Sequence, residues 1–317
     1  MTDKTKTIAV GGPTASGKSA LALSLAEMLG GEIVSCDSMA VYRGMDIGTA
    51  KPTSAELARV PHHMINVCEP AVNFSAADWV EGAARAICDI ASRGRLPIIC
   101  GGTGMYLDAL LRPCSFSNAE GGSDSSEKLR EELRRFAKEH GNDALHARLR
   151  EIDPEAAEAT HPNNLKRVIR ALEIYYTTGI TKTESDRRTK DGEAPYDCRI
   201  VTLDYESRDM LYSRIDRRVD IMAEAGLADE VKKLYESGRL AEGSTAAQGI
   251  GYKEMLLYVK GALPVESAID MIKKNTRNYA KRQITWFKRY RDISIVPDRD
   301  GMMRSADELA CEVINRL

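Results

Sequence analysis

Short apolar runs alternate with longer amphipathic stretches over the first hundred residues of the chain. The apolar runs predict β-strands at 7–10, 32–36 and 96–100. Apolar positions at helical spacing between them predict helices at 18–29 and 76–92. Strands that are each followed by a helix are typical of a parallel sheet covered on both faces. The pattern therefore predicts an α/β fold whose ligands bind beyond the carboxyl ends of the strands.

The pattern changes near residue 115. Residues 117–126 are polar and rich in Gly and Ser, which is typical of a linker. A helical pattern with two X-Pro breaks follows at 127–179, and then a second polar segment at 181–195. We therefore predict that residues 119–195 form a helical insertion domain.

The apolar pattern resumes after the insertion. A run at 200–203 predicts a strand that returns to the sheet, and another strand is predicted at 293–296 within a mostly helical remainder. The core domain is therefore predicted to comprise residues 1–118 and 196–317.

The segment after the first predicted strand, GPTASGKS, matches the GxxxxGK[ST] pattern of a P-loop. Its glycines let backbone N–H groups turn inward toward phosphate oxygens at the start of a helix. Lys18 adds positive charge, and the Ser19 hydroxyl suits Mg²⁺. The alternative, a turn that only connects two elements, leaves Lys18 without a purpose. The predicted phosphate-binding residues are Gly12, Thr14, Ala15, Ser16, Gly17, Lys18 and Ser19.

The P-loop pattern does not say which phosphates are bound. ATP and GTP are the usual occupants, but any pyrophosphate satisfies the same physics. The sequence has neither an NKxD-type guanine-binding motif nor an apolar strand that ends in Asp-Glu. The pattern alone therefore supports a pyrophosphate and magnesium, and a P-loop α/β fold.

Two polar residues follow other predicted strands. Asp37 follows the run that ends at Cys36, and its carboxylate is a candidate general base or second-shell magnesium ligand. The alternative is a turn or N-cap aspartate. Thr103 follows a Gly-Gly pair after the third strand and offers one hydroxyl, which by itself is weak evidence.

Composition and charge exclude several classes of protein. The 317 residues carry a net charge of −2, so the whole chain does not indicate a polyanionic partner. Seven cysteines without a CxxC pair argue against a disulfide framework or a zinc site. No apolar stretch is long enough to span a membrane, and the first apolar run starts too early for a signal peptide. We expect a cytoplasmic protein, and nothing requires more than a monomer.

Positive charge is clustered locally. Residues 273–291 contain eight Lys or Arg and no Asp or Glu, with four aromatic residues interleaved. Such a face would bind RNA phosphates, and it includes Lys281 and Arg282. For the aromatic residues we favour packing in the core over base stacking. A second cluster at helical spacing, Lys166, Arg167 and Arg170, predicts that the insertion also binds RNA.

Longer segments carry a resemblance to a known family. GPTASGKS, DSMAVYRGMDIGTAKP, PHHMIN, FSAADW, GGTGMY, HPNNLKRVIRALE, GIGYKE and AKRQITWFKR occur in the order found in tRNA dimethylallyltransferases. The resemblance implies transfer of a dimethylallyl group from dimethylallyl diphosphate to N6 of the adenine 3′ of the tRNA anticodon, with Mg²⁺. It also implies that the P-loop holds the donor's diphosphate and that donor and flipped-out adenine meet in a channel.

The resemblance assigns roles to matching positions. Asp37 matches the base that takes the N6 proton, and Thr103 matches the hydroxyl at the leaving diphosphate. Arg214 or Arg218 would neutralise that diphosphate. The segments that match tRNA contacts are Asp37, Ser38, Met39 and Ala40 with Thr103, then Lys166, Arg167, Val168, Ile169 and Arg170, and then Gln248, Gly249, Ile250, Gly251, Tyr252 and Lys253. Ala40, Ser19 and Gly249 depart from the commoner Gln, Thr and Ala.

Two other functions remain open on the sequence. A P-loop kinase of a small metabolite would use the insertion as a lid and would consume ATP. A non-catalytic RNA-binding protein with a relic P-loop is disfavoured because Lys18, Ser19, Asp37 and Thr103 are all present.

Overall fold

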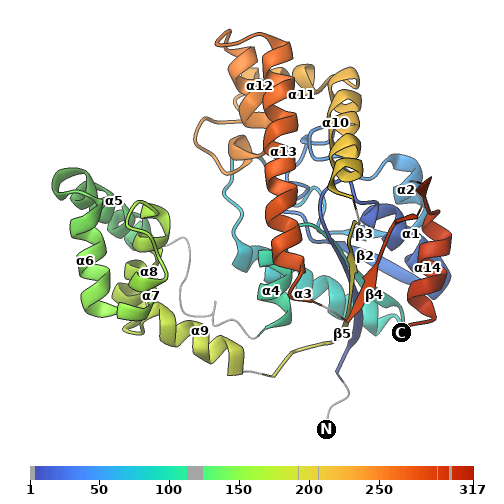
Figure 1. The fold of residues 1–317 in the computed structure, drawn as a ribbon, viewed down its shortest axis with the longest axis horizontal. Coiled ribbons are helices and arrows are strands. Elements are labelled where there is room, and N and C mark those ends of the chain that lie inside the picture. Colours follow the sequence, from blue (N-terminus) through green and yellow to red (C-terminus); the bar gives the residue numbers. More distant parts are fainter. Residues whose placement is uncertain (1–3, 113–123, 192, 206, 291, 300–301) are drawn as a thin grey trace. The chain divides into compact units, whose positions relative to one another are not determined.

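The computed structural model is summarised in Figure 1. It describes residues 4–112, 124–191, 193–205, 207–290, 292–299 and 302–317. Most of the predicted linker at 117–126 lies outside these ranges, and residues 124–126 begin a helix. Nowhere in these ranges is a helix both long and apolar enough to cross a membrane.

A parallel sheet forms the centre of the core and confirms the predicted fold class. Its order is β3-β2-β4-β1-β5-β6, and every described pair of neighbours is parallel. β1 and β4 are almost wholly buried, as expected for strands covered on both faces. The strands are β1 Lys6–Gly11, β2 Gly31–Ser35, β3 His62–His63, β4 Leu96–Gly101, β5 Asp197–Leu203 and β6 Ile293–Ile295.

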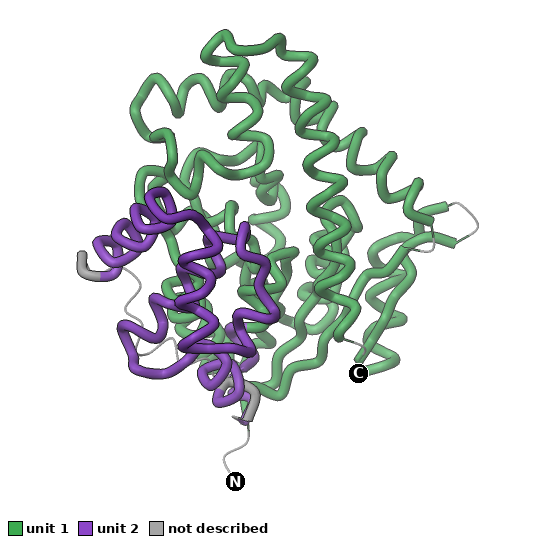
Figure 2. Tube along the Cα trace, turned by 60° about the vertical axis from the view of Figure 1, so that its left-hand side comes forward, with its two compact units in different colours: residues 1–108, 196–317 green, residues 109–195 purple. Residues whose placement is uncertain are grey.

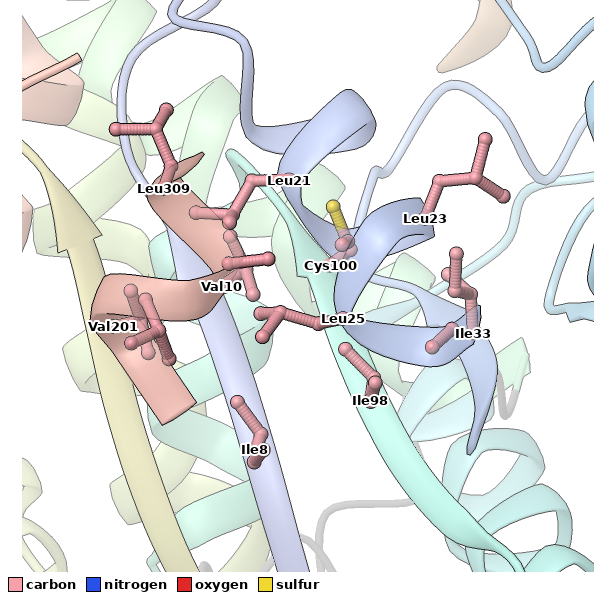
Figure 3. Close-up of a cluster of buried hydrophobic side chains, with 14 of the residues drawn as sticks. Ile8, Val10, Leu21, Leu23, Leu25, Ile33, Ile98, Cys100, Val201 and Leu309 are labelled. Atoms are coloured by element: carbon pink, nitrogen blue, oxygen red, sulfur yellow. The ribbon is translucent and has the colours of Figure 1, made fainter. Parts of the chain in front are cut away.

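Helices cover both faces of this sheet. Leu21 and Leu25 of α1 (Lys18–Leu29) and Leu309 of α14 (Ala306–Ile314) pack on Val10 and Val201 of the strands (Figure 3). The opposite face is covered by α3 (Ala76–Ser92) and α4 (Gly104–Leu111) (Figure 1). Burial of these apolar side chains is the main stabilising contribution to the core, and it fixes the carboxyl ends of β1, β2 and β4 side by side.

The remaining helices of the core follow β2 or β5. The long helix α13 crosses the core beside α10 and α12 (Figure 1). These elements are α2 Ser54–Arg59, α10 Arg208–Glu224, α11 Leu227–Glu236, the 3₁₀ turn η2 Ala246–Gln248, α12 Tyr252–Val259, α13 Val265–Phe287, and the hairpin β7 Asp298–Arg299 with β8 Met302–Met303.

A second compact unit interrupts the core. The chain divides into one unit of residues 1–108 and 196–317 and another of 109–195 (Figure 2), whereas the insertion was predicted to start at 119. The second unit has its own apolar core, with Leu145, Leu149 and Leu172 fully buried. Its helices are α5 Asp124–His140, α6 Asn142–Ile152, α7 Pro154–Glu158, α8 Leu165–Thr178 and α9 Lys182–Asp191.

Helix α9 occupies most of the predicted polar segment at 181–195. No apolar periodicity marks this helix, because its side chains are almost all polar. It is supported instead by the Thr181 hydroxyl, which accepts a hydrogen bond from the backbone N–H of Glu184 at 3.2 Å. Two ion pairs at i, i+4 spacing, Lys182 with Asp186 and Glu184 with Arg188, add to it.

A buried carboxylate lies at the amino end of the sheet, away from the P-loop. Glu32 of β2 is paired with Arg93, and its Oε2 lies 2.7 Å from Nε2 of His63. The hydrogen bonds from Arg93 and then from His63 lower the pKa of Glu32 to about 2, against the effect of burial. His63 therefore has a structural partner in the sheet.

We predict that Glu32→Gln lowers the free energy of unfolding by roughly 2 kcal/mol at pH 7, allowing for the partial exposure of Arg93. The folded pKa lies below the ordinary 4.5, so this stabilisation is present above pH 4.5 and is lost as the pH falls toward 2. Urea unfolding at pH 7 and pH 3 measures it. A wild-type advantage that is equal at both pH values would contradict the assignment.

Candidate active site

The P-loop joins β1 to α1 through an unusual backbone path. Gly12 and Gly17 have φ of 148° and 94°, and Ala15 has a φ of 60°. A left-handed non-glycine residue costs free energy and is found mostly at functional sites. These φ values suit a loop that turns its backbone N–H groups toward a phosphate.

Residues from three other segments hold the loop in this shape. Arg214 Nε on α10 donates to the carbonyl of Ala15 at 2.9 Å. The hydroxyl of Tyr205 donates to the carbonyl of Ser16 at 3.1 Å. The backbone N–H of Thr14 donates to Oε1 of Gln283 on α13 at 2.8 Å.

The bond from Thr14 refines the predicted phosphate cradle. Its N–H is already used by Gln283, so the backbone donors that remain for phosphate follow it, from Ala15 to Ser19. Sequence reasoning assigned Gln283 no role, although it lies within the segment AKRQITWFKR, because nothing in that segment indicates that its amide contacts the P-loop.

A strongly basic cavity of about 360 Å³ opens beside the loop. It is lined by Ala15, Gly17, Lys18, Ser19, Arg214, Arg217, Arg218 and Ile221. Burial lowers the pKa of Lys18 and also that of Arg218, whose charge Asp37 favours. Such a concentration of partly desolvated cations suits a multiply charged anion.

Both predicted arginines, Arg214 and Arg218, line this cavity. Arg217 was not predicted, although its i+3 spacing from Arg214 on α10 was visible in the sequence. The exposed Ser19 hydroxyl lies at the first turn of α1, on the edge of the same cavity.

The ends of β2 and β4 are tied together at the edge of the sheet that carries Asp37, and Thr103 does not line the basic cavity. Thr103 Oγ1 accepts from the backbone N–H of Ser38 at 3.1 Å, and the N–H of Thr103 donates to the Cys36 carbonyl at 3.2 Å. Parallel pairing of β2 with β4 brings these two strand ends to the same edge of the sheet.

Asp37 is both a turn-forming residue and a cavity residue. Its Oδ1 accepts from the backbone N–H groups of Met39 at 2.8 Å and Ala40 at 3.3 Å. Among the described residues, none donates a hydrogen bond to Oδ2. One carboxylate oxygen therefore fixes the turn, while the other is available to a ligand.

A second cavity, of about 270 Å³, extends from Asp37. It is lined by polar residues and by the apolar Ile215, Val219, Met222 and Ile272. Arg218 lines both cavities, so the basic cavity and the Asp37 cavity meet at its side chain. The polar residues that line the Asp37 cavity include Thr14, Asp37, Ser38, Thr49, Arg218, Thr276, Tyr279 and Arg282.

Tyr279 is a cavity residue that sequence reasoning counted only as one of several aromatics. Burial, and then the nearby negative charge of Asp37, raise its pKa to about 12. Its phenol therefore keeps its proton at neutral pH and can donate a hydrogen bond.

In the two predicted segments at this cavity, 37–40 and 248–253, some residues line the cavity and others are buried. Ser38 and Met39 line it, as do Gly249, Ile250 and Gly251, whereas the Ala40 side chain is buried. Met39 Cε occupies the space beside Gly249 that a Cβ there would enter, at 2.6 Å.

Gln248 and Lys253 are exposed, but Tyr252 is fully buried, and its hydroxyl donates to Glu230 at 2.6 Å. Glu230 also accepts from the backbone N–H groups of Asp46 and Ile47. The Tyr252 side chain therefore holds the DIGT turn in place, and the predicted RNA contact of the segment 248–253 stays a prediction.

The basic face of α13 is partly neutralised. Lys281 is exposed and Arg282 lines the second cavity. Other basic residues of the cluster are ion-paired with acids of α10 and α4: Lys273 with Asp220, Arg277 with Asp216 and Arg289 with Asp108. Phe287 is buried, as favoured, and residue 291 lies outside the described residues.

The predicted segment in the second unit, 166–170, also contains both exposed and buried side chains. Lys166 and Arg167 are exposed on α8, and Arg170 is paired with Glu173 at 2.9 Å. Val168 and Ile169 pack in the core of that unit. Their side chains are therefore structural, and the basic side chains alone remain as contacts for a partner.

Comparisons with known proteins show the family to which this chain belongs. A family model described as IPP transferase matches residues 40–290, and one described as isopentenyl transferase matches residues 5–69. A tRNA dimethylallyltransferase of Halalkalibacterium halodurans is 48% identical over 291 residues, which cover 92% of this chain and 90% of that protein.

Solved structures give the same result. A tRNA isopentenylpyrophosphate transferase from Bacillus halodurans has a TM-score of 0.69 at 42% identity, covering 99% of this chain and 97% of that one. A eukaryotic dimethylallyltransferase acting on tRNA has a TM-score of 0.76 at 33% identity, covering 89% and 70%. From the P-loop to α13, the chain thus belongs to the IPP transferase family, the family of the tRNA dimethylallyltransferases.

Proposed function

We propose that this chain transfers the dimethylallyl group of dimethylallyl diphosphate to N6 of the adenosine immediately 3′ of the anticodon in tRNA and releases diphosphate. The observation that carries this proposal is the pair of cavities that meet at Arg218, one strongly basic and one with a carboxylate at its end. The first suits a diphosphate and the second suits a nucleobase with an adjacent base. Relatives named for the same activity support it.

The donor's diphosphate would bind in the basic cavity. Backbone N–H groups after Thr14 would bind its oxygens, and Lys18 and the arginines at 214, 217 and 218 would neutralise its charge. The apolar lining beyond Arg218 would receive the dimethylallyl group. This places the reacting carbon where the two cavities meet.

The residues present fit a magnesium ion. The described residues contain no cluster of His, Cys, Asp or Glu able to hold a metal by itself, so the ligands would be the exposed Ser19 hydroxyl, phosphate oxygens and water. When bound, the ion would stabilise negative charge on the departing diphosphate.

The acceptor adenine would enter the second cavity after leaving the anticodon-loop stack. Asp37 Oδ2 would take one proton from the N6 amine while the N6–carbon bond forms and the bond between carbon and the bridging oxygen breaks. The Thr103 hydroxyl and the cations would stabilise the charge that develops on that oxygen.

RNA contacts would come from both units. In the core we propose Gln248, Lys253, Lys281 and Arg282, and in residues 119–195 the basic side chains of α8 would bind the anticodon stem. Each cysteine that the structure describes is a free thiol, which suits the cytoplasm, and we propose a monomer that binds one tRNA.

The main rival is a P-loop kinase. With unmodified tRNA, Mg²⁺ and both compounds supplied, we expect dimethylallyl diphosphate to be consumed, diphosphate to be released and ATP to remain intact. Conversion of ATP with no loss of the prenyl donor would favour the kinase instead.

We predict that Thr103→Val slows transfer about 10²-fold by removing the hydroxyl at the leaving oxygen. Donor KM should change little, because the P-loop and its cations hold the diphosphate. Thr103→Ser is the matched control and should remain within a few-fold of wild type. Steady-state kinetics at saturating tRNA measure the effect, and unchanged kcat in Thr103→Val would refute the leaving-group role.

A further inference from the structure

The side chain of one glutamine bridges the P-loop and the loop that follows β4. Gln283 lies in the last part of α13 and is 5% exposed. Its Oε1 accepts from the backbone N–H of Thr14 at 2.8 Å, and its Nε2 donates to the carbonyl of Gly102 at 2.9 Å. Since an N–H only donates and a carbonyl only accepts, one orientation of this amide satisfies both loops.

Close packing leaves this side chain little freedom. A Cβ on Gly102 would lie 2.1 Å from Nε2 of Gln283, and a Cβ on Gly104 would lie 2.2 Å from Cδ1 of Trp286. These two glycines flank Thr103, so α13 contacts the loop on both sides of the threonine. The loop is therefore positioned by α13 as well as by its own strand.

The two ends of the bridge carry different parts of the site. Thr14 belongs to the P-loop, whose following residues Ala15, Gly17, Lys18 and Ser19 line the basic cavity. Gly102 immediately precedes Thr103, whose Oγ1 accepts from Ser38. The amide thus sets the spacing between the phosphate cradle and the Thr103 hydroxyl, and an error of about 1 Å in such spacing is able to cost 10²-fold in rate.

We propose that Gln283 is a positioning residue for prenyl transfer: it holds the Thr103 hydroxyl at the distance from the P-loop that the reaction needs. The proposal rests on the proposed function. Gln283 contacts loop backbone on both sides and acts through the groups that those loops carry.

A double-mutant cycle between Gln283→Leu and Thr103→Val tests this coupling. Single-turnover transfer to unmodified tRNA is measured at saturating donor. Gln283→Leu alone should lower the rate about 10- to 100-fold with donor KM nearly unchanged. The double variant should be no more than about three-fold slower than Thr103→Val, because the hydroxyl that Gln283 would position is already absent.

Gln283→Glu is the second variant and keeps the size of the side chain. Its carboxylate still accepts from Thr14 but cannot donate to Gly102, whereas its protonated form does both. The ratio of the Gln283→Glu rate to the Gln283→Leu rate should therefore rise as the pH is lowered. This ratio cancels every effect of pH that the two variants share.

The controls separate positioning from stability. Ser267→Ala changes an exposed residue of the same helix, outside the basic stretch 273–291, and should match wild type. Melting temperatures are measured for every variant, and if Gln283→Leu does not fold, the cycle with Gln283→Glu decides the question. Multiplicative effects in the cycle together with a pH-independent ratio would overturn the positioning role. Wild-type protein that transfers nothing would instead contradict the proposed function, and this inference with it.

Discussion

Replacing Asp37 by asparagine is expected to lower kcat about 10²- to 10⁴-fold, the range for loss of a general base. Asparagine keeps an Oδ1 that accepts from the N–H groups of Met39 and Ala40, so the turn is retained. The change is then confined to the oxygen that would take the N6 proton. Affinity for tRNA should stay nearly the same.

Asp37→Ala is the matched comparison, because it removes both the base and the turn's acceptor. Single-turnover rates and tRNA binding by filter retention are measured for both variants. If Asp37→Asn turns over normally while Asp37→Ala does not, the carboxylate serves only the turn. A large loss of tRNA binding in Asp37→Asn would mean that Asp37 mainly positions the adenine.

Lys18→Met is expected to lower kcat/KM for the prenyl donor about 10²- to 10³-fold. The methionine has nearly the same length, so the change removes the positive charge while leaving most of the packing. Lys18 is partly buried beside Cys100 and lines the basic cavity, and this partial desolvation strengthens its interaction with an anion. Binding of the donor is measured by calorimetry and transfer by initial rates.

Lys232→Met is the control for this variant, since it changes an exposed lysine of α11 that lines neither cavity. It should bind and transfer as wild type does. Equal donor affinity in Lys18→Met and wild type would show that the diphosphate binds elsewhere.

Much of the fold could be predicted from the apolar pattern alone. The runs that end at Val10 and Cys100 became central strands because parallel strands are buried on both faces. Helix α9 was missed, since its support comes from the Thr181 hydroxyl and ion pairs, which leave no apolar period. The second unit begins at residue 109, whereas the polar stretch at 117–126 led to a predicted start at 119; its end at 195 is as predicted.

The candidate site was less predictable than the fold. Asp37 and Thr103 follow strands whose pairing brings them together, so their position could be anticipated. Gln283 lies far along the chain and meets the P-loop only through the packing of α13, which no local pattern reveals. Burial also divided segments that looked uniform, as Tyr252 and Val168 show.

Transfer of a labelled prenyl group to tRNA tests the central claim most directly. The protein is incubated with Mg²⁺, labelled dimethylallyl diphosphate and unmodified tRNA, and the nucleosides are then separated. A matched tRNA carries guanosine in place of the adenosine 3′ of the anticodon. The account predicts labelled N6-dimethylallyladenosine from the first tRNA and no labelled nucleoside from the second. Absence of this product from the first tRNA, or label in the second, would contradict it.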